Sequence, residues 1–243
     1  MICLSKDALE KEKKNIEMLS NGSVDGVLIS VARESLKLQD FSHFNNIIAQ
    51  NSPVVFFDRV PNELMANKVI IDDIENGYKA AKHLVSKGCS KLAILTNPEH
   101  VITGKNRKIG FIKYLDEYNI AFNDSFSLQI SGKKKEEIEP QIGALFNKEI
   151  LPDGIFAINE NFAVIAMKFA HKKGLNVPKD LKIIAFTDGM ISKIANPPLT
   201  TIAQHGYTMG VKATELLLDQ INTKKEKKHI IVVPTNIVER EST

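Results

Sequence analysis

Residues 153–188, DGIFAINENFAVIAMKFAHKKGLNVPKDLKIIAFTD, contain two apolar runs separated by a helical pattern. The runs are residues 153–159 and 181–188, and such continuous apolar runs suit strands that are covered on both faces. Residues 161–173 have helical spacing, and Gly174 supplies the glycine that commonly follows a helix. Strand, helix and strand in this order predict a unit of a parallel α/β sheet.

The same alternation extends along the whole chain, so the predicted fold class is α/β. Further strands are expected at residues 24–30, 53–59, 68–73, 91–97, 126–132 and 229–235. Further helices are expected at residues 5–19, 76–87, 107–118, 137–146 and 207–221. Residues 196–204, NPPLTTIAQ, place two prolines before a short extended run, which suits a connection rather than the interior of a helix or sheet.

Composition and charge exclude several classes of protein. The 243 residues can form one large domain or two modest ones, and a net charge of +3 is too small for a strongly basic nucleic-acid-binding surface. No apolar run approaches membrane-spanning length, and the N-terminal residues lack the order of a signal peptide. Cys3, Cys89 and the six histidines have no metal-ligand spacing, so no metal and no cofactor are predicted. The Lys-rich residues 223–229 are interpreted as a solvated connection.

Seven sequence blocks, taken in order, carry a family resemblance. They are KEKKNIEMLSNGSVDGVLIS (11–30), PVVFFDR (53–59), IDDIENGYKAAKHLVSKGCSKLAIL (71–95), RKIGFIKYL (107–115), PDGIFAINENFAVIAMKFAHKKGLNVPKDLKIIAF (152–186), IIAFTDGMISKIANPPLTTIAQHGYTMGVKATELLLDQI (183–221) and VERES (238–242). Together they resemble the LacI/GalR family of bacterial transcription regulators. The resemblance spans nearly the whole chain, and seven ordered blocks are far more specific than any one of them.

The resemblance implies a type I periplasmic-binding-protein-like fold, in which two parallel-sheet lobes are joined by three crossovers and hold a small molecule between them. The expected N-terminal lobe is residues 1–88 plus 206–225, and the expected C-terminal lobe is residues 89–205 plus 226–243. The chain starts at what resembles the family's second strand. We therefore expect an incomplete N-terminal lobe without its first strand, no helix-turn-helix, and a sheet edge that is distorted or pairs with another chain.

Ligands of open α/β lobes bind beyond the carboxyl ends of the strands. Polar residues after the apolar runs, combined with the family's effector contacts, give seven expected effector-binding residues: Asp58, Thr103, Arg107, Asn159, Thr187, Asp188 and Gln204. The planar guanidinium of Arg107 suits paired sugar hydroxyls or a carboxylate. The family usually has Asp where this chain has Thr187, with Asp188 next to it. The alternatives are a loop or capping carboxylate for Asp58, a surface ion pair for Arg107 and a helix cap for Asn159.

The resemblance implies the effector-sensing and dimerisation core of a cytoplasmic transcription regulator. Its expected partners are a sugar-like small-molecule effector, a second copy in a homodimer, and operator DNA through a domain absent from this chain, with no membrane. A solute-binding protein for sugar transport is the first alternative, and the coding sequence upstream would separate the two. An enzyme with a sugar-like substrate is the second, but no G-x-S-x-G, H-E-x-x-H, P-loop or G-x-G-x-x-G motif is present, so no enzyme is predicted.

Overall fold

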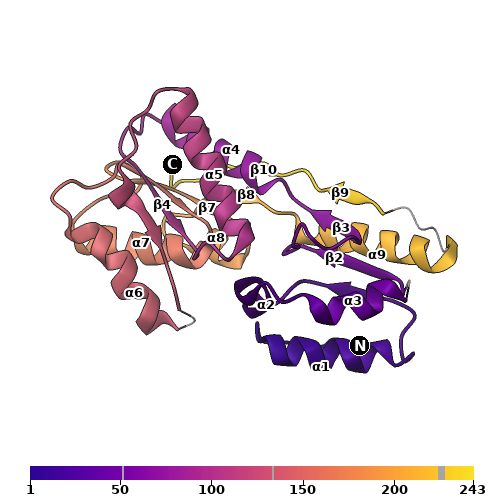
Figure 1. Ribbon diagram of the computed structural model, residues 1–243. Helices are drawn as coiled ribbons and strands as arrows, with labels where there is room; N and C mark the ends of the chain where they lie inside the picture. Colours follow the sequence, from indigo (N-terminus) through magenta and orange to yellow (C-terminus); the bar gives the residue numbers. More distant parts are fainter. Residues whose placement is uncertain (51, 133, 224–227) are drawn as a thin grey trace. The chain divides into compact units, whose positions relative to one another are not determined.

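The computed structural model describes residues 1–50, 52–132, 134–223 and 228–243, and the chain forms two α/β units (Figure 1). Unit 1 comprises Met1–Ile71, His100–Ile102 and His205–Val233. Unit 2 comprises Asp72–Glu99, Thr103–Gln204 and Pro234–Thr243. Both sheets are mainly parallel, which confirms the predicted α/β fold class.

The sheet of unit 1 is parallel throughout, in the order β1 (Val27–Ile29), β2 (Val54–Phe57), β3 (Asn67–Ile70) and β9 (Ile230–Val232). Its helices are α1 (Leu9–Ser20), α2 (Arg33–Leu38), α3 (Ser42–Ala49) and α9 (Gly206–Thr223). One apolar core joins the strands to α1 and α3, and α9 packs against β1, β2 and β3. This unit therefore has the layered form of an α/β domain.

β1 is an edge strand of this sheet. A hollow of about 350 Å³ adjoins it, lined by residues before α1, by α1, by β1 and by Leu217 of α9. The expected pairing of this edge with another chain stays a prediction.

Unit 2 has a six-stranded sheet in the order β10 (Asn236–Val238), β8 (Thr200–Ala203), β7 (Lys182–Phe186), β6 (Gly154–Ala157), β4 (Leu92–Thr96) and β5 (Ser127–Gln129). Only the β10–β8 pair among these is antiparallel. Its helices are α4 (Asp73–Ser86), α5 (Ile102–Glu117), α6 (Lys135–Gly143), α7 (Glu160–Lys172) and α8 (Met190–Ile194), and its 3₁₀ turns are Asp124–Phe126 and Ala144–Asn147. The central strands β4, β6 and β7 are almost entirely buried, as their continuous apolar runs predicted.

The units divide the chain at other positions than the sequence analysis expected. The first boundary lies at Ile71 rather than residue 88, because α4 packs against β6 and β7 of unit 2. Near the C-terminus, β9 pairs with β3 and so belongs to unit 1 up to Val233. α9 lies in unit 1 although it comes late in the chain, and the chain leaves unit 2 after Gln204, at the end of the NPPLTTIAQ stretch.

Three helices and two strands have no counterpart in the predicted elements, namely α2, α3, α8, β8 and β10. The interpretation of residues 196–204 as a connection outside a sheet was wrong for β8, which pairs with β7 and β10, because the two prolines precede the strand rather than lie in it. Part of the Lys-rich connection, residues 224–227, lies outside the described residues. Among the described residues, no helix combines the length and hydrophobicity that a bilayer crossing requires.

Candidate functional site

Arg107 of α5 is held at the carboxyl edge of the unit 2 sheet. Its Nε donates a hydrogen bond to Oδ1 of Asp73 at 2.8 Å, and its Nη1 donates to the carbonyl oxygen of Ile158 at 3.0 Å. Its Cζ lies 3.4 Å from the ring centre of Phe186, the last residue of β7. Arg107 is only 7% exposed, so the surface ion pair considered from sequence does not describe it. A guanidinium fixed on three sides presents its other N–H groups in a defined direction.

Thr103 and Asn159 lie close to Arg107 in the fold. Thr103 is buried on α5, four residues before Arg107, and residues at this spacing share a helix face. Asn159 follows Ile158 directly and caps α7, because its Oδ1 accepts a hydrogen bond from the backbone N–H of Phe162 at 2.9 Å. Asn159 is therefore a helix cap, which was the alternative interpretation of this residue from sequence.

Thr187 and Gln204 are brought together at the ends of β7 and β8. The hydroxyl of Thr187 donates to Oε1 of Gln204 at 3.4 Å. The backbone N–H of Thr187 donates to the carbonyl oxygen of Ile202 at 3.0 Å. The φ angle of Thr187 is 74°, a region that few non-glycine residues occupy. Such residues occur preferentially at functional sites, which fits the predicted role of Thr187.

Asp188 takes part in a network with the C-terminal segment. Its Oδ1 lies 2.7 Å from Nη2 of Arg240 and accepts a hydrogen bond from the hydroxyl of Thr201 at 2.9 Å. Arg240 also donates to the carbonyl oxygen of Leu199 at 2.8 Å. The Asp188 carboxylate therefore ties β7 to β8 and to the chain end.

Asp58 is the one predicted site residue in unit 1. It follows β2 with a φ angle of 60°, and its backbone N–H donates to the carbonyl oxygen of Val69 at 3.2 Å. This is the arrangement that Thr187 has after β7. The two units thus each place a non-glycine residue with positive φ directly after a strand that ends in Phe.

His100 also belongs to unit 1 and lies near two basic side chains. Burial lowers the pKa of His100, and the charges of Lys37 and Arg33 lower it further. Its imidazole is therefore neutral at pH 7, able both to donate and to accept a hydrogen bond.

Three residues with a role at this edge were not selected from the sequence. Asp73 and Phe186 hold the Arg107 side chain, as described above. Glu160 accepts hydrogen bonds from the backbone N–H groups of Gly189 at 2.6 Å and Ser192 at 3.1 Å, and so fixes the loop after β7. The signal for Glu160 was its place directly after Asn159, where acidic residues favour a helix N-terminus.

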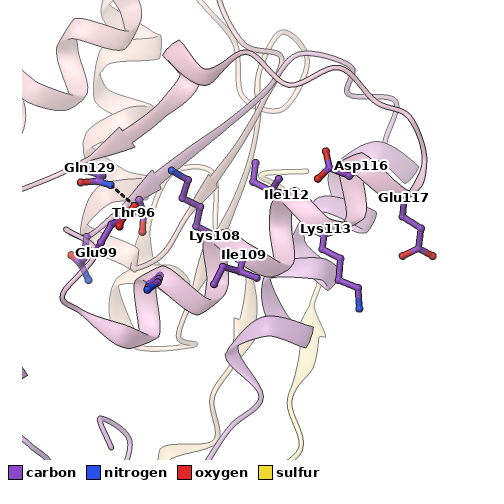
Figure 2. Close-up of a pocket in the computed structure, with 11 residues that line it drawn as sticks. Thr96, Glu99, Lys108, Ile109, Ile112, Lys113, Asp116, Glu117 and Gln129 are labelled. Carbon is purple, nitrogen blue, oxygen red and sulfur yellow. Dashed lines mark hydrogen bonds between the residues drawn. The ribbon is translucent and has the colours of Figure 1, made fainter. Parts of the chain in front are cut away.

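A hollow of about 750 Å³ lies on the other face of α5 and contains none of the seven predicted residues (Figure 2). Its lining combines Ile109 and Ile112 with lysines, carboxylates and residues of β4 and β5, and the side chains of Lys105 and Lys108 belong to it. Arg107 points instead toward the strand ends, as its contacts with Ile158 and Phe186 establish. Charged side chains of one exposed helix face are typical of solvent-facing surface, so the Arg107 edge is the stronger candidate. Among the described residues, no three His, Cys, Asp or Glu side chains are grouped to hold a metal ion.

Comparison with known proteins agrees with this architecture. The family model of the periplasmic binding protein-like domain matches residues 81–243. The HTH-type transcriptional regulator DegA of Bacillus subtilis (strain 168) is 31% identical over all 243 residues, which span 71% of that protein. The HTH-type transcriptional repressor PurR of Haemophilus influenzae (strain PittEE) is 34% identical over 230 residues, or 93% of this chain and 65% of PurR.

Solved structures of LacI-type regulators are similar to this chain as well. The LacI family transcriptional regulator from Enterococcus faecium with bound ribose has a TM-score of 0.80 and 26% identity, over 95% of this chain and 83% of that one. The periplasmic binding protein/LacI transcriptional regulator from Alkaliphilus metalliredigens QYMF, complexed with D-xylulofuranose, has a TM-score of 0.82 and 25% identity, over 100% of this chain and 86% of that one. With its fold, its ordered motifs and these relatives, the chain belongs to the LacI/GalR family of transcriptional regulators and carries the family's periplasmic-binding-protein-like domain.

Proposed function

We propose that this chain is the effector-sensing core of a LacI-type transcriptional regulator. It binds a small polar metabolite, sugar-like in its hydroxyl groups, and binding controls the attachment of the regulator to operator DNA through a helix-turn-helix outside this chain. The observation that carries the proposal is the buried guanidinium of Arg107, fixed by Asp73, Ile158 and Phe186 at the strand ends where parallel sheets bind ligands.

The proposed ligand contacts are the seven residues expected from sequence: Asp58, Thr103, Arg107, Asn159, Thr187, Asp188 and Gln204. Arg107 is the principal one, because it offers several donors from a rigid and desolvated position. Asp188 contributes with its carboxylate oriented by Arg240. No cofactor is required, since binding rather than bond cleavage is the proposed activity.

The relatives favour a regulator over a transport protein or an enzyme. DegA and PurR are both named as transcriptional regulators, and the Enterococcus faecium relative holds ribose. We further propose that the regulator acts in the cytoplasm and that it forms a homodimer. Sedimentation equilibrium of the purified chain tests the dimer. In a dimer, a ligand shifts the DNA-binding state only by its differential affinity for the two states, typically about 1–3 kcal/mol of coupling.

A thermal-shift screen followed by calorimetry tests the proposal. Sugars, nucleosides and amino acids are screened, since a ligand at one hundred times its Kd stabilises the native state by about 2.7 kcal/mol. For a chain of this size that is a rise in Tm of several degrees. A library in which no compound stabilises the chain, at concentrations up to 10 mM, would count against a sensing function.

A further inference from the structure

The positive charge of Arg107 is compensated at contact distance. Its Nε lies 2.8 Å from Oδ1 of Asp73, and both side chains are more than nine-tenths buried. Because the pair is removed from water, the carboxylate rather than solvent neutralises the guanidinium. For a ligand at this edge, the N–H groups of Arg107 are therefore hydrogen-bond donors whose positive charge is neutralised by the Asp73 carboxylate.

Helix geometry fixes this pairing. Asp73 lies in the first turn of α4, and Arg107 lies on α5, 34 positions further along the chain. The backbones of α4 and α5 approach each other directly at Gly77 and Gly110, with no side chain between them. The backbone of Asp73, one turn before Gly77, is therefore held beside α5.

The arginine that pairs with Asp188, two residues after β7, is compensated as well. Nη2 of Arg240 lies 2.7 Å from Oδ1 of Asp188. Glu160 adds a further carboxylate, which is hydrogen-bonded to the loop after β7. An anion placed here would lose its hydration without gaining an uncompensated cation, and such desolvation is costly.

We propose that the Asp73–Arg107 pair makes this site select uncharged, oxygen-rich ligands over anionic ones, with Asp73 as the positioning residue that sets this preference. The inference rests on the proposed function, because it concerns the ligand class of the same site. Hydroxyl and carbonyl oxygens of a ligand can accept hydrogen bonds from those N–H groups of Arg107 that do not donate to Asp73 or Ile158. A phosphate or carboxylate brings a second negative charge beside Asp73.

The first test compares a neutral sugar with its phosphate. Kd values for ribose and ribose 5-phosphate, and for glucose and glucose 6-phosphate, are measured by calorimetry on the wild type, Asp73→Asn and Glu75→Gln. Glu75 is an exposed carboxylate of the same helical turn, so its substitution changes the net charge equally without touching Arg107. Wild type and Glu75→Gln are expected to bind the sugar at least tenfold more tightly than its phosphate, and Asp73→Asn to lower that ratio at least tenfold. A wild type that prefers the phosphate, or an unchanged ratio in Asp73→Asn, overturns the inference.

The second test needs no cognate ligand, so it separates failure of the inference from failure of the proposed function. The Tm is measured in sodium sulfate and in sodium chloride at equal ionic strength. Sulfate stabilises all the variants by its exclusion from protein surfaces, so the readout is the difference between them. Asp73→Asn, and Asp73→Ser as a second variant of the same charge, are expected to show a larger rise in Tm from chloride to sulfate than wild type and Glu75→Gln. An equal rise in the wild type and in both Asp73 variants overturns the inference. A wild type that binds no neutral compound counts against the sensing function, whatever sulfate does.

Discussion

Gly77 of α4 and Gly110 of α5 lie in reciprocal backbone contact where the two helices cross. A Cβ atom on Gly77 would lie 1.9 Å from the carbonyl oxygen of Arg107, and one on Gly110 would lie 1.7 Å from the carbonyl oxygen of Ile74. The absence of a side chain at both positions is thus what allows the crossing. This contact holds Asp73 opposite Arg107 and so supports the candidate site.

Alanine at either crossing glycine is expected to destabilise the chain. Gly77→Ala and Gly110→Ala should each lower the free energy of unfolding by about 2–3 kcal/mol, because backbone rather than a flexible side chain must move. Gly210→Ala on α9 is the matched control, since nothing lies within 4 Å of its added Cβ. It should raise stability by about 0.5–1 kcal/mol through helix propensity. Urea denaturation measures all three, and equal behaviour of the three variants would contradict the crossing.

Arg240 is expected to stabilise unit 2 through Asp188 and the carbonyl of Leu199. Arg240→Ala should lower the free energy of unfolding by about 2 kcal/mol, because it removes charge-assisted hydrogen bonds and leaves the Asp188 carboxylate without its cation. Glu239→Gln is the neighbouring control. Glu239 pairs with Lys87 at the surface, where ion pairs contribute little. Urea denaturation measures both variants, and an unfolding midpoint of Arg240→Ala equal to that of Glu239→Gln would refute this role.

His83 is expected to reduce stability as the pH falls from 7.5 to 5. Burial lowers the pKa of His83, which lies on α4 with Nε2 2.9 Å from the hydroxyl of Thr243. Below about pH 6.5 the unfolded chain binds a proton that the folded chain resists, so stability is lost as the pH drops toward the folded pKa. His83→Gln should lose less stability over this interval than wild type in urea titrations at both pH values. Equal losses would rule out His83 as a contributor.

The two cysteines are expected to react at very different rates. Burial raises the pKa of Cys89 to about 11, while Cys3 is only partly buried. Iodoacetamide at pH 7.5 should therefore label one cysteine in the native chain and two in urea. Peptide mapping by mass spectrometry identifies the site, and rapid native labelling of Cys89 would contradict its burial.

Local patterns predicted the central strands β4, β6 and β7 because their buried runs are continuous and short. They missed α2, which ends at Gln39 with a φ angle of 52°, in a position where a glycine would have marked the end of the helix. Helical periodicity also does not reveal which sheet a helix covers. The contacts of α4 with β6 and β7 of unit 2 therefore emerge only from the structure.

The candidate site was predictable only in part. Strand ends and family motifs pointed to Arg107, Asn159 and Thr187, which lie at one sheet edge. The partners of Arg107 and Asp188 were not predictable, because Asp73 and Arg240 are distant in sequence and pair only through the tertiary fold. The ends of the predicted strands thus locate the edge of the sheet at which the candidate site lies. The partners of each side chain there depend on contacts between residues that are distant in sequence.

The affinity of the best library ligand for Arg107→Ala and for Lys108→Ala, measured by calorimetry, tests the central claim most directly. The two residues are adjacent on α5, but Arg107 faces the strand ends and Lys108 lines the hollow of Figure 2. Arg107→Ala is expected to weaken binding at least tenfold, or about 1.4 kcal/mol, while Lys108→Ala leaves it unchanged. Full binding by Arg107→Ala, with loss in Lys108→Ala, would move the ligand to the other face of the helix and contradict the account.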